Sequence, residues 1–277
     1  MNDLRIHAPS EAPPSGVWWM DLYDDLLADV FLEREEEVAD TLVFLRRVLG
    51  LEPGMRVFDQ CCGIGRLAIP LGQQGFVACG CDVIPRYIER ALEKAQTAGV
   101  CVELATADAF EFTTSVPCDG AFNWWTSFGY VQEDAANMRM LQRAFESLKP
   151  SARFALDFMN VPGVLRGFQA RTETVRETPW GTVQLVRESQ IELREMVMLK
   201  KWRYDFRAER TTEDITDRKA NRRTVQHHSR VRLYLPHELI ALFERAGFGD
   251  IELYGDLAGN PLGLDSPRCI VVGRRPE

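Results

Sequence analysis

The chain has 277 residues, of which 45% are hydrophobic and 27% are charged, a balance typical of a globular protein with a sizeable core. Its formal net charge of −8 provides no overall positive field for phosphate groups, so we expect no nucleic acid partner. No run approaches the roughly 20 apolar residues of a membrane span, and polar residues interrupt the first positions, so we expect a cytoplasmic protein without membrane association.

Seven cysteines are present, and several stand in apolar runs where buried free thiols are common. Neither the Cys61-Cys62 pair nor Cys79-x-Cys81 has a matching second pair at the spacing of a zinc site. We therefore expect structural thiols in a reducing compartment. We also expect no metal site.

The first 50 residues are predicted to contain an arm and helices. Residues 1–16 are rich in proline and serine, which favours a loose arm. Apolar residues such as Leu22 and Leu26 then recur at helical spacing, and Gly50 marks the end of a second helix. We expect residues 1–36 to form the arm and a lid helix.

Between residues 37 and 160, short apolar strands alternate with helices. We expect strands at 56–59, 77–82, 101–108, 119–124 and 153–159, with helices at 65–75, 85–99 and 134–150. This alternation predicts a parallel sheet with right-handed crossovers. The predicted fold class is therefore α/β, with a Rossmann-like, doubly wound and mostly parallel sheet.

The second half of the chain has a different pattern. Residues 161–235 contain long charged segments in which apolar and polar residues alternate, which predicts antiparallel strands with one solvated face. Residues 236–277 then predict one helix and two further strands of the core sheet. We expect the antiparallel strands to be an inserted meander that acts as a substrate lid or a dimer interface.

The segment "VFDQCCGIGRLA" connects the first core strand to its helix. Gly63, Gly65 and Ala68 spell G-x-G-x-x-A, which taken alone fits a dinucleotide site. Asp59 stands directly before this turn, where it would repel a pyrophosphate but favour a cofactor that carries an amine. The carboxylate therefore favours a cationic cofactor.

This segment resembles the motif of class I S-adenosylmethionine-dependent methyltransferases, V-L-D-x-G-C-G-x-G, and the likeness extends over roughly residues 37–158. The resemblance implies that S-adenosylmethionine is the cofactor and S-adenosylhomocysteine its product. It also implies that Asp59 lies near the methionyl amino group, and that Cys61, Gly63 and Gly65 line the cofactor. Cys61 stands where the family usually has glycine, so the approach of the backbone to the ligand is altered there.

Two more carboxylates follow successive strands. By the same resemblance, Asp82 would accept the two ribose hydroxyls and Val83 would pack beside the adenine. Asp108 would bind the adenine amino group, and the backbone amide of Ala109 would assist it. Each aspartate alone fits a helix cap or a turn equally well, but three at successive strand ends form a rarer pattern.

Aromatic residues surround the expected position of the transferred methyl group. The segment after the fourth strand, "NWWTSFGYVQED", suggests Trp125, Phe128 and Tyr130 as substrate-binding residues and Asn123 as a cofactor contact. We expect Tyr130 to act in catalysis as well.

The segment before the core is the second source of aromatic residues. Trp19 could close the pocket over the substrate, and Tyr23 could reach the cofactor carboxylate. Arg66 could pair with the same carboxylate. Packing of the helix on the sheet, or a surface position for Arg66, explains these residues equally well.

A sulfonium methyl group is already activated, so its in-line transfer needs positioning and desolvation more than covalent catalysis. If the acceptor arrives protonated, His228 is the candidate base. We expect an N- or O-methyltransferase that acts on a small-molecule metabolite. A homodimer through Met196, Met198 and Trp202 is an additional expectation.

Two alternatives remain open from the sequence. One is a non-catalytic protein that binds S-adenosylmethionine, because methyl transfer requires no obligatory catalytic residue. The other is an NAD-dependent oxidoreductase, which Asp59 disfavours.

Overall fold

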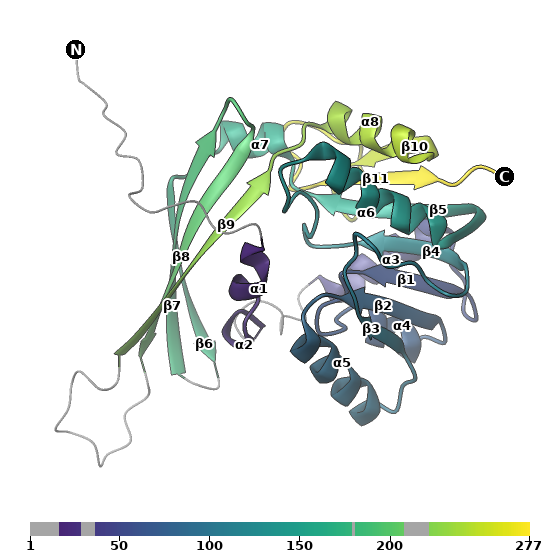
Figure 1. The fold of residues 1–277 in the computed structure, drawn as a ribbon, viewed down its shortest axis with the longest axis horizontal. Helices are drawn as coiled ribbons and strands as arrows, with labels where there is room; N and C mark the ends of the chain where they lie inside the picture. Colours follow the sequence, from purple (N-terminus) through teal and green to yellow (C-terminus); the bar gives the residue numbers. More distant parts are fainter. Residues whose placement is uncertain (1–16, 29–36, 179–180, 208–221) are drawn as a thin grey trace.

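The computed structural model describes residues 17–28, 37–178, 181–207 and 222–277. Two sheets stand side by side, with short N-terminal helices between them (Figure 1). The larger sheet has seven strands in the order β10-β11-β5-β4-β1-β2-β3. Its strands are β1 (Arg56–Gln60), β2 (Val77–Asp82), β3 (Glu103–Thr106), β4 (Cys118–Asn123), β5 (Leu148–Phe158), β10 (Gly249–Tyr254) and β11 (Cys269–Arg274).

The first five strands of this sheet are parallel, and β11 runs antiparallel to both β5 and β10. The predicted Rossmann-like, mostly parallel sheet is therefore confirmed. The strand order reverses between β1 and β4, and in such sheets ligands bind beyond the carboxyl ends of the strands at this switch point.

Helices cover both faces of the seven-stranded sheet because side chains of a strand alternate between its faces. Val57 and Phe122 belong to an apolar cluster on one face, with α3 (Val38–Leu49) and α4 (Ala68–Gln73). Phe58 and Ala121 belong to a cluster on the other face, with α6 (Asp134–Glu146) and α8 (Pro236–Ala246). Helix α5 (Pro85–Thr97) contacts β2, β3 and α4.

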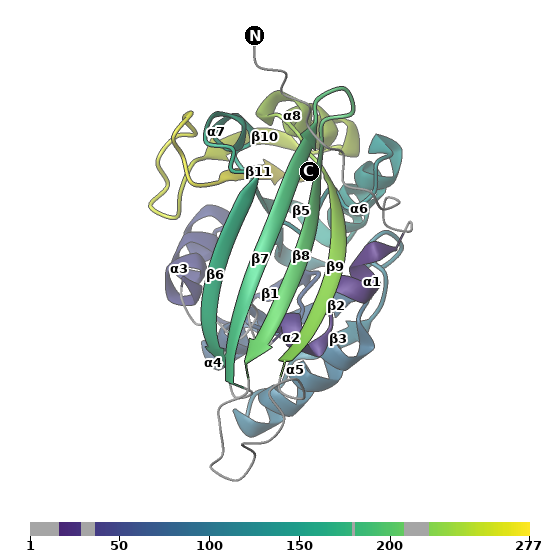
Figure 2. The same cartoon turned by 90° about the vertical axis from the view of Figure 1, so that its left-hand side faces the viewer.

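The smaller sheet is an antiparallel meander in the order β6-β7-β8-β9. Its strands are β6 (Arg171–Thr178), β7 (Gly181–Glu192), β8 (Val197–Arg207) and β9 (Arg222–Arg232). The meander lies between α7 (Val161–Arg166) and α8 in the chain, as the predicted insertion does. In the view of Figure 2 it lies in front of the seven-stranded sheet.

Helix α7 and strand β6 were not predicted from the sequence. Strand β6 carries a single large apolar residue, Val175, which is 56% exposed, so its sequence lacks the alternation that marks a half-buried strand. Eight successive residues of β6 nevertheless pair with β7, which shows that the neighbouring strand organises this edge.

One face of the meander, here called the inner face, packs toward the seven-stranded sheet. Met198 joins the core cluster of α6 and α8, and Val231 packs with Trp18 of the N-terminal helices. Met198 is only 4% exposed, and Trp202 is half-buried. The expectation of an exposed Met198 and Trp202 stripe for dimerisation is therefore corrected, because these side chains are used within the chain.

The N-terminal segment forms two short helices, α1 (Trp18–Leu22) and α2 (Asp25–Leu27), where one longer helix was expected. The break occurs because the Asp24 carboxylate accepts a hydrogen bond from the backbone N–H of Leu27 at 2.8 Å, which caps α2. The predicted apolar residues at 30 and 31 lie outside the described residues. Within the described part of the chain, no helix is long and apolar enough to cross a membrane.

Candidate functional site

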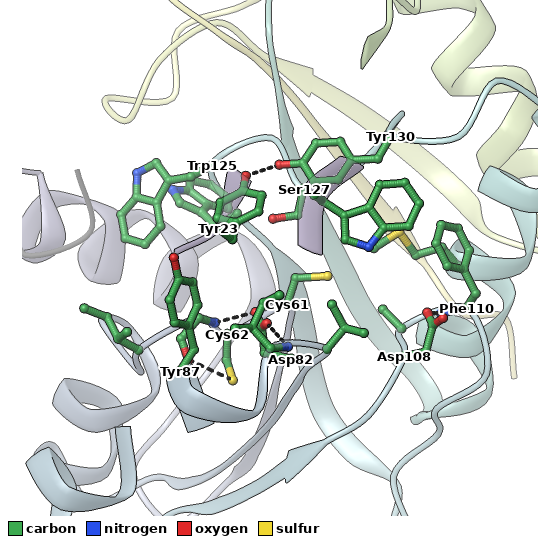
Figure 3. A pocket seen from close by; sticks show the side chains of 18 of the residues that line it. Tyr23, Cys61, Cys62, Asp82, Tyr87, Asp108, Phe110, Trp125, Ser127 and Tyr130 are labelled. Carbon is green, nitrogen blue, oxygen red and sulfur yellow. Dashed lines mark hydrogen bonds between the residues drawn. The ribbon is translucent and has the colours of Figure 1, made fainter. Parts of the chain in front are cut away.

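A cavity of about 860 Å³, part of it open to solvent, lies at the carboxyl ends of β1, β2 and β4 (Figure 3). The strand ends supply Cys61, Asp82 and Trp124, and the N-terminal segment supplies Trp19 and Tyr23. The remaining lining residues are Cys62, Gly63, Ile64, Arg66, Val83, Ile84, Tyr87, Asp108, Ala109, Phe110, Trp125, Ser127, Tyr130 and Met140. Its walls are thus mostly apolar and aromatic, with carboxylates at two strand ends.

The glycine turn forms the floor of the cavity. Gly63 has φ +54° and Cys61 has φ +65°, so a residue with a side chain occupies the left-handed region at the position where the family usually has glycine. The amide of Asn123 donates to the Cys61 sulfur at 3.7 Å. Burial raises the pKa of the Cys61 thiol well above its usual value, and nearby carboxylates add to this effect. The thiol is therefore neutral and unreactive at neutral pH.

Asp82 fixes the turn against the end of β2. Its carboxylate accepts the N–H of Gly63 at 2.9 Å and the N–H of Ile84 at 3.0 Å, one on each oxygen. Burial raises the pKa of Asp82, while these backbone N–H groups oppose the shift. Because each carboxylate oxygen can accept more than one hydrogen bond, Asp82 retains acceptor capacity toward the cavity.

Asp108 and Ala109 lie on the far side of the cavity. The Asp108 carboxylate is exposed and accepts the N–H of Phe110 at 2.9 Å, which closes a local turn. Ala109 is buried beside it. The structure thus brings the predicted Asp82, Val83, Asp108 and Ala109 to one cavity.

Three predicted cofactor residues do not line the cavity. Asp59 is 4% exposed, and its carboxylate accepts a backbone hydrogen bond from Ala68 at the start of α4. Asn123 is buried, and its amide donates to Gln60 and to Cys61. A side chain at Gly65 would stand 2.9 Å from Ile69, so this glycine permits packing between helices. All three lie at or beneath the turn, and their predicted cofactor contacts stay predictions.

The loop after β4 is strained at two consecutive positions. Trp125 has φ +59° and Thr126 has φ +62°, and non-glycine residues rarely adopt either value. The N–H of Trp125 donates to the Asp157 carboxylate at 3.2 Å. The Arg66 guanidinium lies 3.8 Å from the centre of the Trp125 ring. The loop therefore holds Trp125 between a buried carboxylate and a stacked cation.

Asp157 is a functional candidate that the sequence analysis did not single out. Arg268 pairs with Asp157 at 3.3 Å and with Glu37 at 2.9 Å. Burial raises the pKa of Asp157 to about 6, although Arg268 opposes the shift. The sequence alone does not reveal that Asp157 supports Trp125, because the contact depends on the end of β5 lying next to the loop after β4.

Aromatic rings from the N-terminal segment cover the cavity. The hydroxyls of Tyr23 and Tyr130 are hydrogen-bonded to each other (Figure 3), and the Trp18 and Tyr130 ring centres are 4.7 Å apart. Burial raises the pKa of Tyr23 to about 12 and that of Tyr130 well above its usual value. Both tyrosines are therefore neutral at pH 7. They can orient a ligand by hydrogen bonding but are poor bases.

Contacts from α5 and β9 hold the two N-terminal helices α1 and α2, here called the lid, in place. Tyr87 of α5 donates its hydroxyl hydrogen to the carbonyl of Asp24 at 2.9 Å, and Arg86 pairs with Asp25 at 3.2 Å. On the other side, the Nε2 atom of His227 lies 3.3 Å from the Asp24 carboxylate. The lid therefore bridges the Rossmann-like sheet and the meander.

Two other predicted site residues lie elsewhere. Phe128 is fully buried, with its ring 5.5 Å from Tyr234 and 6.3 Å from Phe158, so it belongs to the core and the prediction of substrate contact is corrected. His228 points to the outer face of the meander because His227, its neighbour in β9, contacts the lid. Its predicted role as a base is corrected for the same reason.

The cavity fits S-adenosylmethionine better than a dinucleotide. Asp82 can accept a vicinal diol, and the apolar walls beside it suit a purine and a thioether chain. A pyrophosphate would instead meet the carboxylate of Asp82, whose charge also helps to raise the pKa of the buried Asp59 beneath the turn. Among the described residues, no group of three His, Cys, Asp or Glu side chains could hold a metal ion.

Comparisons with known proteins agree with this geometry. Residues 57–151 match a family model described as "Methyltransferase domain". Over 113 residues, the chain is 32% identical to the S-adenosyl-L-methionine-dependent Diels-Alderase iccD of Talaromyces variabilis, covering 39% of this chain and 37% of that protein. The chain spans less than half of the length of the curated relatives it matches.

Solved structures share the fold over nearly the whole chain. A S-adenosylmethionine-dependent methyltransferase from Clostridium acetobutylicum superposes with a TM-score of 0.72 at 14% identity, covering 94% of this chain and 98% of that one. The sugar N-methyltransferase KedS8 from Streptoalloteichus superposes with a TM-score of 0.69 at 18% identity, covering 100% of both chains. The meander is therefore part of a fold that these proteins share.

Proposed function

We propose a function from one premise: this chain is a class I S-adenosylmethionine-dependent methyltransferase, as its domain match and its fold indicate. It transfers a methyl group to a nitrogen or oxygen atom of a small molecule. One observation carries this proposal: the cavity joins the carboxylate of Asp82 and the glycine turn to an aromatic roof that includes Trp19 and Tyr130. A site of this kind can hold the cofactor and exclude water from the transfer.

The cofactor supplies a sulfonium methyl group that is already activated for transfer. Asp82 holds the ribose hydroxyls, and Val83 and Phe110 pack against the adenine. Asp108 and the amide of Ala109 bind the adenine edge. Cys61, Gly63, Arg66 and Tyr23 surround the methionyl end.

The acceptor binds on the aromatic side of the cavity. Trp125 and Tyr130 provide flat walls there, and Ser127 between them provides a hydroxyl for hydrogen bonding. Asp157 keeps Trp125 in its strained conformation, so the wall is formed before the ligand binds. These residues favour transfer by orienting the acceptor and removing it from water.

Proton removal is a minor part of this mechanism. Among the described residues that line the cavity there is no histidine, and both tyrosines are neutral at pH 7. The acceptor is therefore a neutral amine, or a hydroxyl acidic enough to ionise without a strong base.

A second function is a cofactor-dependent reaction without methyl transfer. The match to a Diels-Alderase that depends on S-adenosyl-L-methionine favours this alternative, and so does a lining that holds no strong base. Such a protein would bind the cofactor in the same cavity but would not consume it.

Calorimetric titration with S-adenosylmethionine, S-adenosylhomocysteine and NADH tests the site. We expect both sulfur compounds to bind the wild-type protein and to bind Asp82→Ala much more weakly. The control is Asp119→Ala, because Asp119 is an aspartate of β4 whose carboxylate accepts the backbone N–H of Arg56 and pairs with Lys149, away from the cavity. Binding of NADH alone would overturn the proposal.

A further inference from the structure

The inner face of the meander carries charge where the meander meets the lid. Lys200 and Trp202 of β8 share this face with Arg187 of β7. The ring of Trp202 has the Arg187 guanidinium 5.7 Å and the Lys200 ammonium 5.8 Å from its centre. Two cations thus flank one indole ring.

Hydroxyl groups stand on both sides of Lys200. Ser189 of β7 and Ser229 of β9 are its direct neighbours across the sheet, on the same face. The Ser229 oxygen accepts the indole N–H of Trp202 at 2.8 Å, which leaves the hydroxyl hydrogen of Ser229 free to donate. Lys200 and the two serines therefore offer several hydrogen-bond donors around the Lys200 ammonium.

No carboxylate compensates the charge of Lys200 in the described part of the chain, where none lies within ion-pair distance of its ammonium. Burial lowers the pKa of Lys200 to about 8, and the charge of Arg187 adds to the shift. Keeping the buried Lys200 ammonium charged therefore costs free energy, which a bound anion would recover.

The position of this group relates it to the cavity. Along β8, Met198 packs into the core cluster and Trp202 packs against the lid cluster that contains Tyr23 and Tyr130. Lys200 lies between these two positions in β8, and helix α1 of the lid contacts the neighbouring strand β9 (Figure 1). Tyr23 and Tyr130 also line the cavity, so an anion at Lys200 would lie near its aromatic wall, on the side away from the cofactor turn.

We propose that Lys200, Arg187, Ser189 and Ser229 bind an anionic oxygen group of the methyl acceptor, a carboxylate or a phosphate, and that Trp202 packs against its planar body. This proposal rests on the proposed function, and it adds the charge of the substrate. The aromatic lining of the cavity sets the shape of the acceptor, and the meander selects its anionic end.

The test compares probes that differ in charge but little in shape. Benzoate, phenyl phosphate and neutral benzamide are titrated into the protein saturated with S-adenosylhomocysteine. The variants are Lys200→Met and the matched control Lys201→Met, whose side chain lies on the opposite face of β8. We expect at least one anion to bind the wild type and Lys201→Met about tenfold or more tightly than benzamide. We expect Lys200→Met to lose this preference.

Melting of the ligand-free proteins gives a second measurement. We expect Lys200→Met to melt at a higher temperature than the wild type because it removes a buried charge, whereas Lys201→Met should melt like the wild type. Equal binding of anions and benzamide by the wild type would overturn the proposal, and so would a lower melting temperature for Lys200→Met. Failure of the wild-type protein to bind S-adenosylhomocysteine would instead refute the proposed function. The failure of this proposal and the failure of the proposed function are therefore distinguishable.

Discussion

The two sheets of this protein differ in what their buried faces contain. The seven-stranded sheet is packed on both faces by large apolar clusters, and its polar groups gather at the strand ends around one turn. The meander has a small apolar cluster of its own, including Val183, Leu185 and Tyr204, and carries Lys200 and Arg187 on the same face. Our proposals accordingly assign cofactor binding to the first sheet, and selection of the ligand to the charged part of the second.

This difference predicts that changes in the seven-stranded half alter cofactor binding and changes in the meander do not. The largest effect is expected for Asp82→Ala. It removes the acceptor of two ribose hydrogen bonds, each worth about 1.5–3 kcal/mol when the acceptor is charged. Calorimetry should show S-adenosylhomocysteine binding weakened by about 100-fold or more. An unchanged affinity would contradict the assignment of the site.

Asp157→Asn tests the support of the aromatic loop. The pKa of Asp157 is raised to about 6, so the folded state binds more protons than the unfolded state between about pH 4 and pH 6. The wild type should therefore lose stability as pH rises through this window. Asp157→Asn, which stays neutral, should be more stable at pH 7 by about 1–3 kcal/mol. Denaturant unfolding at pH 4 and pH 7 measures this difference, which should nearly vanish at pH 4.

The corresponding test in the meander has the opposite sign. Lys200 has a pKa lowered to about 8 from an ordinary value of 10.5, so the unfolded state binds more protons between these two pH values. The wild type should gain stability relative to Lys200→Met as pH rises from 8 toward 10.5. Parallel unfolding curves at several pH values would show the gain. A constant difference would mean that Lys200 is not disfavoured by burial.

The smallest effect is expected at Cys61. The left-handed conformation costs a residue with a side chain about 1–2 kcal/mol. Cys61→Gly removes this cost but also makes the unfolded chain more flexible, which lowers the gain in stability. We expect a net gain of about 0–1 kcal/mol, with cofactor binding retained. Cys61→Ala is the control, because alanine keeps the strain. Equal stability of the two variants would contradict this explanation.

The sequence was sufficient to predict the cofactor half of the molecule. Its strands alternate with helices, and Asp82 ends β2 while Asp108 lies two residues beyond β3, at strand ends that must meet at one edge of a parallel sheet. Local patterns therefore located the cavity. They did not show which side of β1 Asp59 would occupy, and that side placed its carboxylate under the turn.

The substrate half could not be predicted in the same way. The contact between Asp157 and Trp125 joins residues 32 positions apart, and Lys200 meets Ser189 and Ser229 only through strand pairing. Phe128 looks like an aromatic wall in the sequence but is core, because the loop after β4 turns at Trp125 and Thr126. Such arrangements depend on tertiary packing, which the sequence pattern does not specify.

The most direct test of the central claim is an assay with S-adenosylmethionine that carries a trideuterated methyl group, incubated with small amines and phenols that also bear an anionic group. We predict that mass spectrometry will find S-adenosylhomocysteine together with a product that carries the intact labelled methyl group, and that Asp82→Ala will form neither. Conversion of an acceptor without consumption of the labelled cofactor would contradict methyl transfer and favour the Diels-Alderase type of reaction.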